Sequence, residues 1–210
     1  MQIGEAMAKA APDWEKYLKF RCTGCGNCCR RTVVMVTDLD IDRILDFEGG
    51  RLEDFIRFVN EDEAKIEKRS AWWIRFAHAG RASRSVMALQ HRPGGACVFL
   101  DDDERCTIYE NRPVTCREHP FEVELGDTLA VEHIAISDIV PCPHDWDGHV
   151  TKRELRDVVR WNERQSEAFL DKIQSWNRRR RGPKTRPAFL RSLGYDVQGG
   201  ERRSSGSSGK

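Results

Sequence analysis

The sequence of 210 residues lacks the features that mark several large classes of protein. It has no run of 18 apolar residues, which argues against a membrane-spanning helix. Its N-terminal stretch is interrupted by Glu5 and Lys9, so it does not resemble a secretory signal peptide, and no Asn-x-Ser/Thr sequon occurs. We therefore expect a cytoplasmic protein whose thiols stay reduced.

The common catalytic and nucleotide-binding motifs are also missing. The sequence contains no Gly-x-Gly-x-x-Gly, Walker loop, Gly-x-Ser-x-Gly or His-Glu-x-x-His. This argues against a nucleotide cofactor, a serine hydrolase and a zinc protease. Hydrophobic residues still make up 39% of the chain and charged residues 33%, which permits a folded core.

Charge is distributed unevenly along the chain. Residues 151–210 contain 16 Lys and Arg against 7 Asp and Glu, so the preceding 150 residues are net acidic. A basic run covers Arg178–Arg181, Lys184 and Arg186, and residues 204–209 are rich in Ser and Gly. We predict a basic, disordered tail over 178–210. Such a tail can contact nucleic acid or an anionic surface, but no aromatic residues interleave with the basic run, which favours a solvated tail. The sequence leaves open whether the protein binds a protein partner.

Cysteines carry most of the information in this sequence. Four form Cys-x2-Cys-x2-Cys-Cys, three more lie within 20 residues, and the last precedes a proline. The set is Cys22, Cys25, Cys28, Cys29, Cys97, Cys106, Cys116 and Cys142. In a chain without an export signal, such clustering favours metal binding over disulfides. Two residues between thiolates let a tight turn direct both sulfurs to one ion, and Gly24 and Gly26 suit that turn.

The adjacent pair Cys28-Cys29 is unusual for a single mononuclear site. Neighbouring side chains diverge in an extended chain, so the pair would serve two metals, two positions of a cluster, or one ligand and one packed thiol. Eight thiolates can fill two zinc sites of four cysteines each. They can equally supply a four-thiolate iron–sulfur cluster and leave several to spare.

The ordered arrangement of these motifs resembles a known family. The matching elements are Phe20–Cys29, Cys97-Val98-Phe99-Leu100, Cys106-Thr107-Ile108-Tyr109, Arg112-Pro113, Cys116-Arg117, Pro120-Phe121 and Cys142-Pro143. They resemble the YkgJ-like cysteine-cluster family, named for Cys-x2-Cys-x2-Cys-Cys, over about residues 17–145. The resemblance implies a zinc- or iron-chelating protein, with some members called oxidoreductases and similar domains in flagellin lysine N-methylases. The chain departs from the family pattern at His119 and His144, and either imidazole could be an added ligand.

Hydrophobic periodicity and turn residues predict an α+β fold. We expect helices over 12–19, 37–47, 51–60 and 151–176, and strands over 32–36, 72–74, 86–89, 121–125 and 128–131. Thr151 and Glu154 form a capping box at the start of the last helix. The whole is predicted to be a small, irregular, metal-stabilised domain over 1–177, with short hairpins, a loop-borne cysteine cluster (motif core about 17–145) and a long C-terminal helix over about 151–177.

These patterns favour a metal-binding cysteine-cluster protein, with iron–sulfur preferred over zinc. Three thiolates on one turn, glycine N–H groups near sulfur, and the nearby arginines Arg21, Arg30 and Arg117 suit a negatively charged cluster. Such a cluster would support a redox or modification reaction of unknown substrate. The alternatives are a structural zinc module that acts as an interaction protein, and a protein-lysine N-methylase-like enzyme. The sequence does not decide whether the protein is an enzyme.

Overall fold

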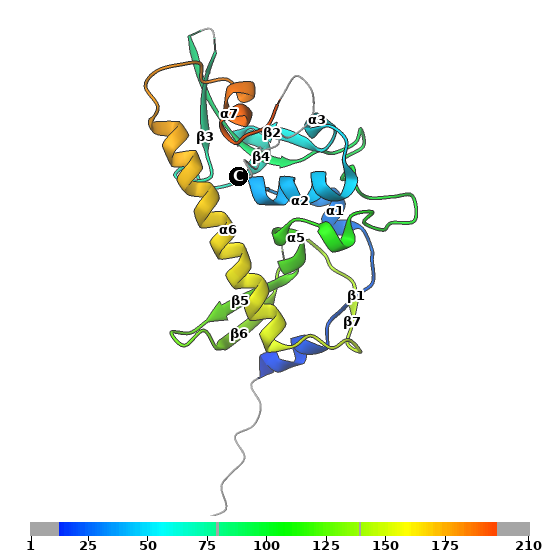
Figure 1. The fold of residues 1–210 in the computed structure, drawn as a ribbon. Coiled ribbons are helices and arrows are strands. Elements are labelled where there is room, and N and C mark those ends of the chain that lie inside the picture. The colour runs from blue at the N-terminus through cyan, green and yellow to red at the C-terminus, as the bar shows by residue number, and fades with distance from the viewer. Residues whose placement is uncertain (1–12, 79, 139, 197–210) are drawn as a thin grey trace, which may run out of the picture.

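The computed structural model describes residues 13–78, 80–138 and 140–196, and these adopt the predicted α+β fold (Figure 1). Its longest element is helix α6, Lys152–Arg178, which runs along the molecule and contacts several other elements (Figure 1). The predicted capping box is confirmed, because Thr151 accepts from the Glu154 N–H while Glu154 accepts from the Thr151 N–H. No helix within the described residues is both long and apolar enough to cross a bilayer.

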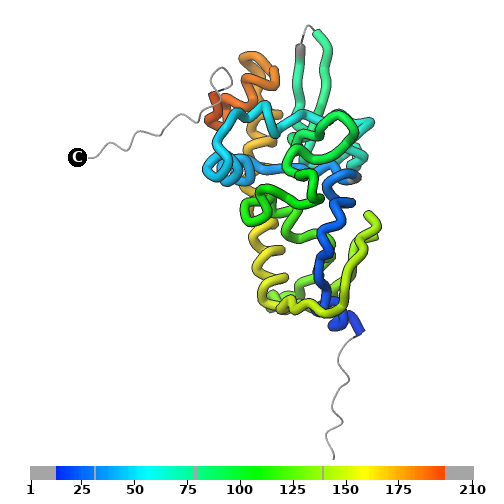
Figure 2. Tube along the Cα trace, turned by 90° about the vertical axis from the view of Figure 1, so that its right-hand side faces the viewer, coloured from blue at the N-terminus to red at the C-terminus, as the bar shows by residue number. Residues whose placement is uncertain are grey.

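The strands form three small antiparallel sheets, of which two contact α6. In the largest, β4 (Arg81–Leu89) lies between β2 (Ile56–Val59) and β3 (Ile74–His78). The hairpin of β5 (Phe121–Leu125) and β6 (Val131–Ile136) lies beside the N-terminal half of α6, whereas β3 lies beside its C-terminal end (Figure 1). The third sheet pairs β1 (Arg21–Cys22) with β7 (His144–Asp145), which joins the beginning of the described chain to residues 144–145 (Figure 2).

The remaining helices are short except for α2, Asp38–Glu48, which begins after the cap residue Thr37 and ends at Gly49 as predicted. Two of the others are 3-10 helices, η1 (Asp13–Lys19) and η2 (Tyr109–Asn111). The rest are α-helices, namely α1 (Asn27–Arg31), α3 (Leu52–Phe55), α4 (Glu61–Ala64), α5 (Val114–Glu118) and α7 (Arg186–Ser192). The N-terminal helix is thus of the 3-10 type, and Pro12, at the start of its predicted range, lies outside the described residues.

Four sequence-based predictions of secondary structure are wrong in detail. The strands expected over 72–74 and 128–131 are found at Ile74–His78 and Val131–Ile136. The expected helix over 51–60 stops at Phe55, and Ile56–Val59 forms β2. Its β-branched and aromatic residues pair with Val86–Leu89, so sheet pairing overrides the helical spacing. The expected strand over 32–36 makes one isolated bridge, from Met35 to Ala88.

The predicted disordered tail is partly folded. Helix α7 lies within residues 178–196, and Phe189 is fully buried against Trp176, with ring centroids 5.4 Å apart. The hydroxyl of Tyr195 donates to the Asp38 carbonyl oxygen at 2.9 Å. Three apolar side chains in a row, Ala188 to Leu190, explain why this segment packs despite the basic residues before it. Residues 197–210, including the Ser- and Gly-rich stretch, lie outside the described residues.

Candidate metal centre

The cysteine-rich turn starts in strand β1 and ends in helix α1. Gly24 and Gly26 have φ values of 68° and 67°, in the left-handed region that glycine tolerates. The first of these glycines donates its N–H to the Cys22 sulfur at 3.4 Å, and the second precedes α1, which carries Cys28 and Cys29. The sulfurs of these two cysteines lie 3.9 Å apart. The helical turn therefore brings together two side chains that an extended chain would separate.

Two further cysteines occupy similar turns in the loop that follows β4. Cys97 is tied to α1, because its N–H donates to the Cys29 carbonyl oxygen at 2.7 Å. The Phe99 N–H then bonds the Cys97 sulfur, and the Ile108 N–H bonds the Cys106 sulfur. The sulfurs of Cys22, Cys97 and Cys106 thus each accept a hydrogen bond from the N–H of the residue two positions later. Such bonds stabilise a thiolate and orient it.

Cys116 is held by helix α5, whose first turn is fixed by a buried carboxylate. The Val114 N–H donates to Oδ1 of Asp40 at 3.1 Å. Gln165 of α6 donates to the same oxygen at 3.3 Å and to the hydroxyl of Thr37 at 2.9 Å. This polar network joins α2, α5 and α6 and thereby sets the position of Cys116 relative to the core.

Cys142 returns to the beginning of the motif through the β1–β7 pairing. Cys22 stands opposite His144 in the register of the two strands. The hydroxyl of Thr23 donates to the Pro143 carbonyl oxygen at 2.9 Å, and the amide of Asn27 donates to the Pro141 carbonyl oxygen at 2.9 Å. The last cysteine is therefore brought back to the first turn, more than 100 residues earlier in the chain.

Mutual electrostatic effects divide the thiols into two groups, linked by Cys28. The inner group comprises Cys28, Cys29, Cys97, Cys106 and Cys116, and the outer group comprises Cys22, Cys25 and Cys142. Burial raises the pKa of Cys116, and negative charge at Cys97, Cys28 and Cys106 raises it further. Burial raises the pKa of Cys142 to about 11, with charge at Cys22, Cys25 and Cys28 adding to the effect.

Cys28 has a lowered pKa, whereas the pKa values of Cys29, Cys97, Cys106, Cys116 and Cys142 are raised. The hydrogen bond from Cys29 lowers the pKa of Cys28 to about 6, with backbone N–H groups and the guanidinium of Arg112 adding to the effect. The same contact, followed by burial, raises the pKa of Cys29. These contacts favour the thiolate at Cys28, which is the form in which cysteine binds metal.

Arginine 112 is the cation that sequence reasoning missed. It lowers the pKa of Cys28, Cys106 and Cys116 as a secondary electrostatic effect, and it stacks 3.7 Å from the ring centroid of Tyr109. Its Nε is buried with no hydrogen-bond partner among the described residues. It belongs to the Arg112-Pro113 motif already evident in the sequence, although only its spatial position shows that it adjoins the thiols.

The three arginines expected to neutralise a cluster have other partners. Arg21 bonds to Asp145 and Asp147 at 2.7 Å, and Arg30 pairs with Glu104. Arg117 donates to the Arg112 carbonyl oxygen at 3.3 Å and stacks on Trp161. Arg30 still lies near Cys29 and Cys25, whose charges contribute to its raised pKa after its hydrogen bond with Glu104.

The two histidines considered as added ligands have different surroundings. His144 donates from Nδ1 to the Cys142 carbonyl oxygen at 2.6 Å, and its ring packs 4.4 Å from that of Trp146. Burial lowers the pKa of His119, and its Nε2 has no hydrogen-bond partner within the described residues. His144 thus supports the loop that carries Cys142.

The chemistry of the donor set fits zinc or an iron–sulfur cluster. All eight cysteines are free thiols, and thiolates are the preferred ligands of both. As the side chains lie, no three Cys, His, Asp or Glu groups within 13–78, 80–138 and 140–196 come close enough together to hold one ion. The backbone turns that carry the cysteines are already formed, so metal binding would require only that the cysteine side chains change their orientation.

Comparison with known proteins places the chain in a family. Residues 21–138 match the family model CxxCxxCC, described as "Putative zinc- or iron-chelating domain", so the chain belongs to this family of metal-chelating proteins. An uncharacterized protein of Methanocaldococcus jannaschii is 25% identical over 126 residues, which is 58% of this chain. The chain matches only 57% of the length of that relative. No solved structure matches.

Proposed function

We propose that the eight cysteines bind metal, that four of them hold an iron–sulfur cluster, and that the protein is an electron-transfer or redox-supporting protein. The observation that carries this proposal is the repeated turn in which the sulfurs of Cys22, Cys97 and Cys106 each accept an N–H from two residues later. Hydrogen bonds to ligand sulfurs are among the factors that set the reduction potential of a cluster. An iron–sulfur cluster, when bound, would supply one-electron chemistry.

The grouping of the thiols supports an assignment of the inner and outer thiols to separate metal sites. The inner group contains five thiols, of which Cys97 is buried and the others are half-buried. We assign the cluster to four of these five. Cys22, Cys25 and Cys142 would then form a second, more exposed set, for which Cys28 is the nearest fourth thiolate. Arg112 would offset negative charge in the inner group.

One observation favours the alternative of structural zinc. The Cys28 and Cys29 sulfurs lie 3.9 Å apart. Two thiolates bound to one tetrahedral zinc through bonds of ~2.3 Å lie ~3.8 Å apart. In this alternative the metal would stabilise the fold and present a surface for a protein partner.

The proposal includes the extent of the domain. We infer one metal-binding unit that continues beyond residue 177, because α7 packs on Trp176 and on β-sheet residues of the same core. The segment that returns after α6 also donates its Lys184 side chain to the Asn177 carbonyl oxygen at 2.8 Å. Residues 178–196 would thus be needed for the stability of the metal-binding unit.

Analysis of anaerobically purified protein tests the choice of metal. Expression with added iron, followed by measurement of iron, zinc and acid-labile sulfide, should give iron and sulfide in similar amounts. Cys116→Ser should lower both, whereas Ser192→Ala, a substitution on α7, should leave them unchanged. Stoichiometric zinc without sulfide, in protein never exposed to air, would replace the iron–sulfur proposal with the zinc alternative.

A further inference from the structure

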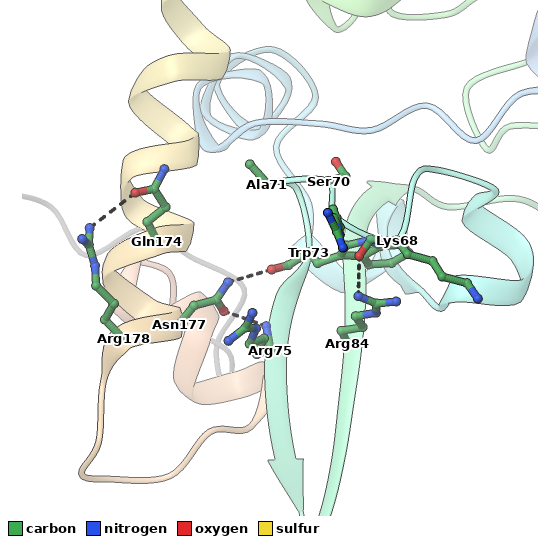
Figure 3. A pocket seen from close by; sticks show the side chains of 10 residues that line it. Lys68, Ser70, Ala71, Trp73, Arg75, Arg84, Gln174, Asn177 and Arg178 are labelled. Atoms are coloured by element: carbon green, nitrogen blue, oxygen red, sulfur yellow. Dashed lines mark hydrogen bonds between the residues drawn. The ribbon is translucent and has the colours of Figure 1, made fainter.

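A second candidate site lies at the C-terminal end of α6, away from the cysteines. A pocket of about 330 Å³ opens between the last turns of this helix and residues 68–84, which include β3 and the start of β4 (Figure 3). Its lining includes five basic residues, Lys68, Arg69, Arg75, Arg84 and Arg178, and no acidic residue. Neither the family description nor the proposed metal chemistry accounts for this concentration of positive charge.

Two of these arginines are forced together by the strand register. Arg75 of β3 stands directly opposite Arg84 of β4. Like charges in directly opposed positions destabilise an antiparallel pair. Arg84 forms a bidentate pair with Glu61, a carboxylate near which Lys68 also lies. Among the described residues, no ion pair joins Arg69, Arg75 or Arg178 to a carboxylate. Glu61 thus offsets the charge of Arg84, whereas a bound anion would offset the charges of Arg69, Arg75 and Arg178.

The wall of the pocket is held in place by amide hydrogen bonds. The side chain of Asn177 accepts from the Arg75 N–H at 2.8 Å and donates to the Trp73 carbonyl oxygen at 2.7 Å (Figure 3). Arg84 donates to the Lys68 carbonyl oxygen at 2.6 Å (Figure 3). The strand edge, the helix end and the preceding loop are therefore fixed relative to one another. The backbone segments that carry the basic side chains are thus ordered before a ligand binds, which reduces the entropy cost of binding.

The aromatic residue of the pocket does not offer a stacking surface. Trp73 is only 4% exposed, its indole N–H donates to the Glu67 carbonyl oxygen, and Arg84 lies 5.0 Å from its ring centroid. Proteins that bind single-stranded nucleic acid combine positive charge with exposed aromatic platforms. The pocket volume is also near the lower limit for small-molecule sites, ~300 Å³. Both features favour a small ligand over nucleic acid.

We propose that this pocket binds a small phosphorylated molecule with at least two negative charges, such as a diphosphate group. Arg75 and Arg178 would approach the anion from the strand and the helix, and guanidinium groups match phosphate oxygens geometrically. The site is independent of the metal centre, because none of its lining residues is a cysteine.

Calorimetric titration with inorganic pyrophosphate tests the proposal on the full-length protein as purified. The expected result is saturable one-to-one binding that Arg75→Gln and Arg178→Gln each weaken about tenfold, as the loss of one charge-assisted hydrogen bond implies. The control is Arg153→Gln, which removes the same charge from an exposed position in the first turn of α6, ~37 Å away along the helix at ~1.5 Å per residue. It should change the affinity less than twofold.

Parallel titrations with ADP and a single-stranded oligonucleotide identify the source of the phosphate. Equal affinity for pyrophosphate and ADP supports recognition of the diphosphate alone, whereas tighter binding of ADP supports a nucleotide ligand. An absence of saturable pyrophosphate and ADP binding would overturn the proposal, as would equal weakening by Arg153→Gln. Binding of the oligonucleotide alone, through the same arginines, would replace it with a nucleic-acid site. Unchanged thermal unfolding of each variant confirms that it is folded.

Discussion

Asp40 is only 1% exposed, yet its carboxylate accepts hydrogen bonds from groups on three helices or their caps. One oxygen accepts from the N–H and the hydroxyl of Thr37, and the other accepts from Arg43, Val114 and Gln165. A buried charge is tolerated because these donors replace water. The residue therefore matters to the metal centre through the position of α5, which carries Cys116.

Replacing this carboxylate should be costly. Asp40→Ala leaves Arg43 and several buried donors without a partner, so we expect the free energy of unfolding to fall by about 3 kcal/mol. Asp46→Ala, on the exposed face of the same helix, should change it by less than ~0.5 kcal/mol. Urea unfolding measures both. A loss for Asp40→Ala no larger than that for Asp46→Ala would contradict the structural role assigned to this network.

At the residue scale the sequence predicted the family, but it did not predict which residues lie next to the cysteines. The cysteine spacing identified a metal-binding class, whereas Arg112 and Asp40 depend on contacts between segments far apart in the chain. The position of Gln165 in the sequence could have predicted one of these contacts. It is a polar residue within the apolar face of α6, and its burial requires a hydrogen-bonding partner.

Elements with strong local signals are those that the sequence predicted well. Helix α2 has its own cap and terminating glycine, and α6 has a capping box. The strand β5 was also found where it was expected, whereas β6 begins at Val131, where its expected range ends. Segments 51–60 and 186–192 were assigned incorrectly because their structure depends on tertiary contacts. The first pairs with β4, and the second packs on Trp176. Local propensity does not register either contact.

The packing of α7 leads to a test at the level of this element. Phe189 is fully buried and contacts the rings of Phe58, Phe76 and Trp176. Phe189→Ala should lower the free energy of unfolding by about 3–5 kcal/mol, because it removes a buried ring and leaves a cavity. Arg191→Ala, at an exposed position on the same helix, should have little effect. Equal stability of the two variants in urea would show that residues 186–192 do not belong to the core.

The molecule as a whole places its cysteines either in irregular segments or in elements of only two to five residues. Residues 90–113 contain turns, isolated bridges and η2, and the 137–150 segment is joined to the start of the described chain by the two-residue pairing of β1 and β7. Few backbone hydrogen bonds connect these segments to the larger sheet. Metal bound by the thiols of each segment together with thiols of α1 would therefore tie both segments to that helix.

Removal of the metal should accordingly destabilise the protein. Metal binding that requires the folded state contributes directly to the free energy of folding. We expect chelation or Cys25→Ser to lower the melting temperature by at least ~10 °C, which corresponds to a few kcal/mol for a chain of this size. Calorimetry on anaerobic protein measures the change. A melting curve that does not shift on metal depletion, in protein with eight titratable thiols, would mean that no structural metal is bound.

The central claim is that the cysteines, and no other side chains, bind the metal. X-ray absorption spectroscopy at the metal edge of anaerobically purified protein tests it most directly, because it reports the ligand atoms. We predict a first coordination shell of sulfur alone, at ~2.3 Å, for zinc and for an iron–sulfur cluster. Only the cluster adds a second shell of iron scatterers. A first shell dominated by nitrogen or oxygen at ~2.0–2.2 Å would contradict the claim.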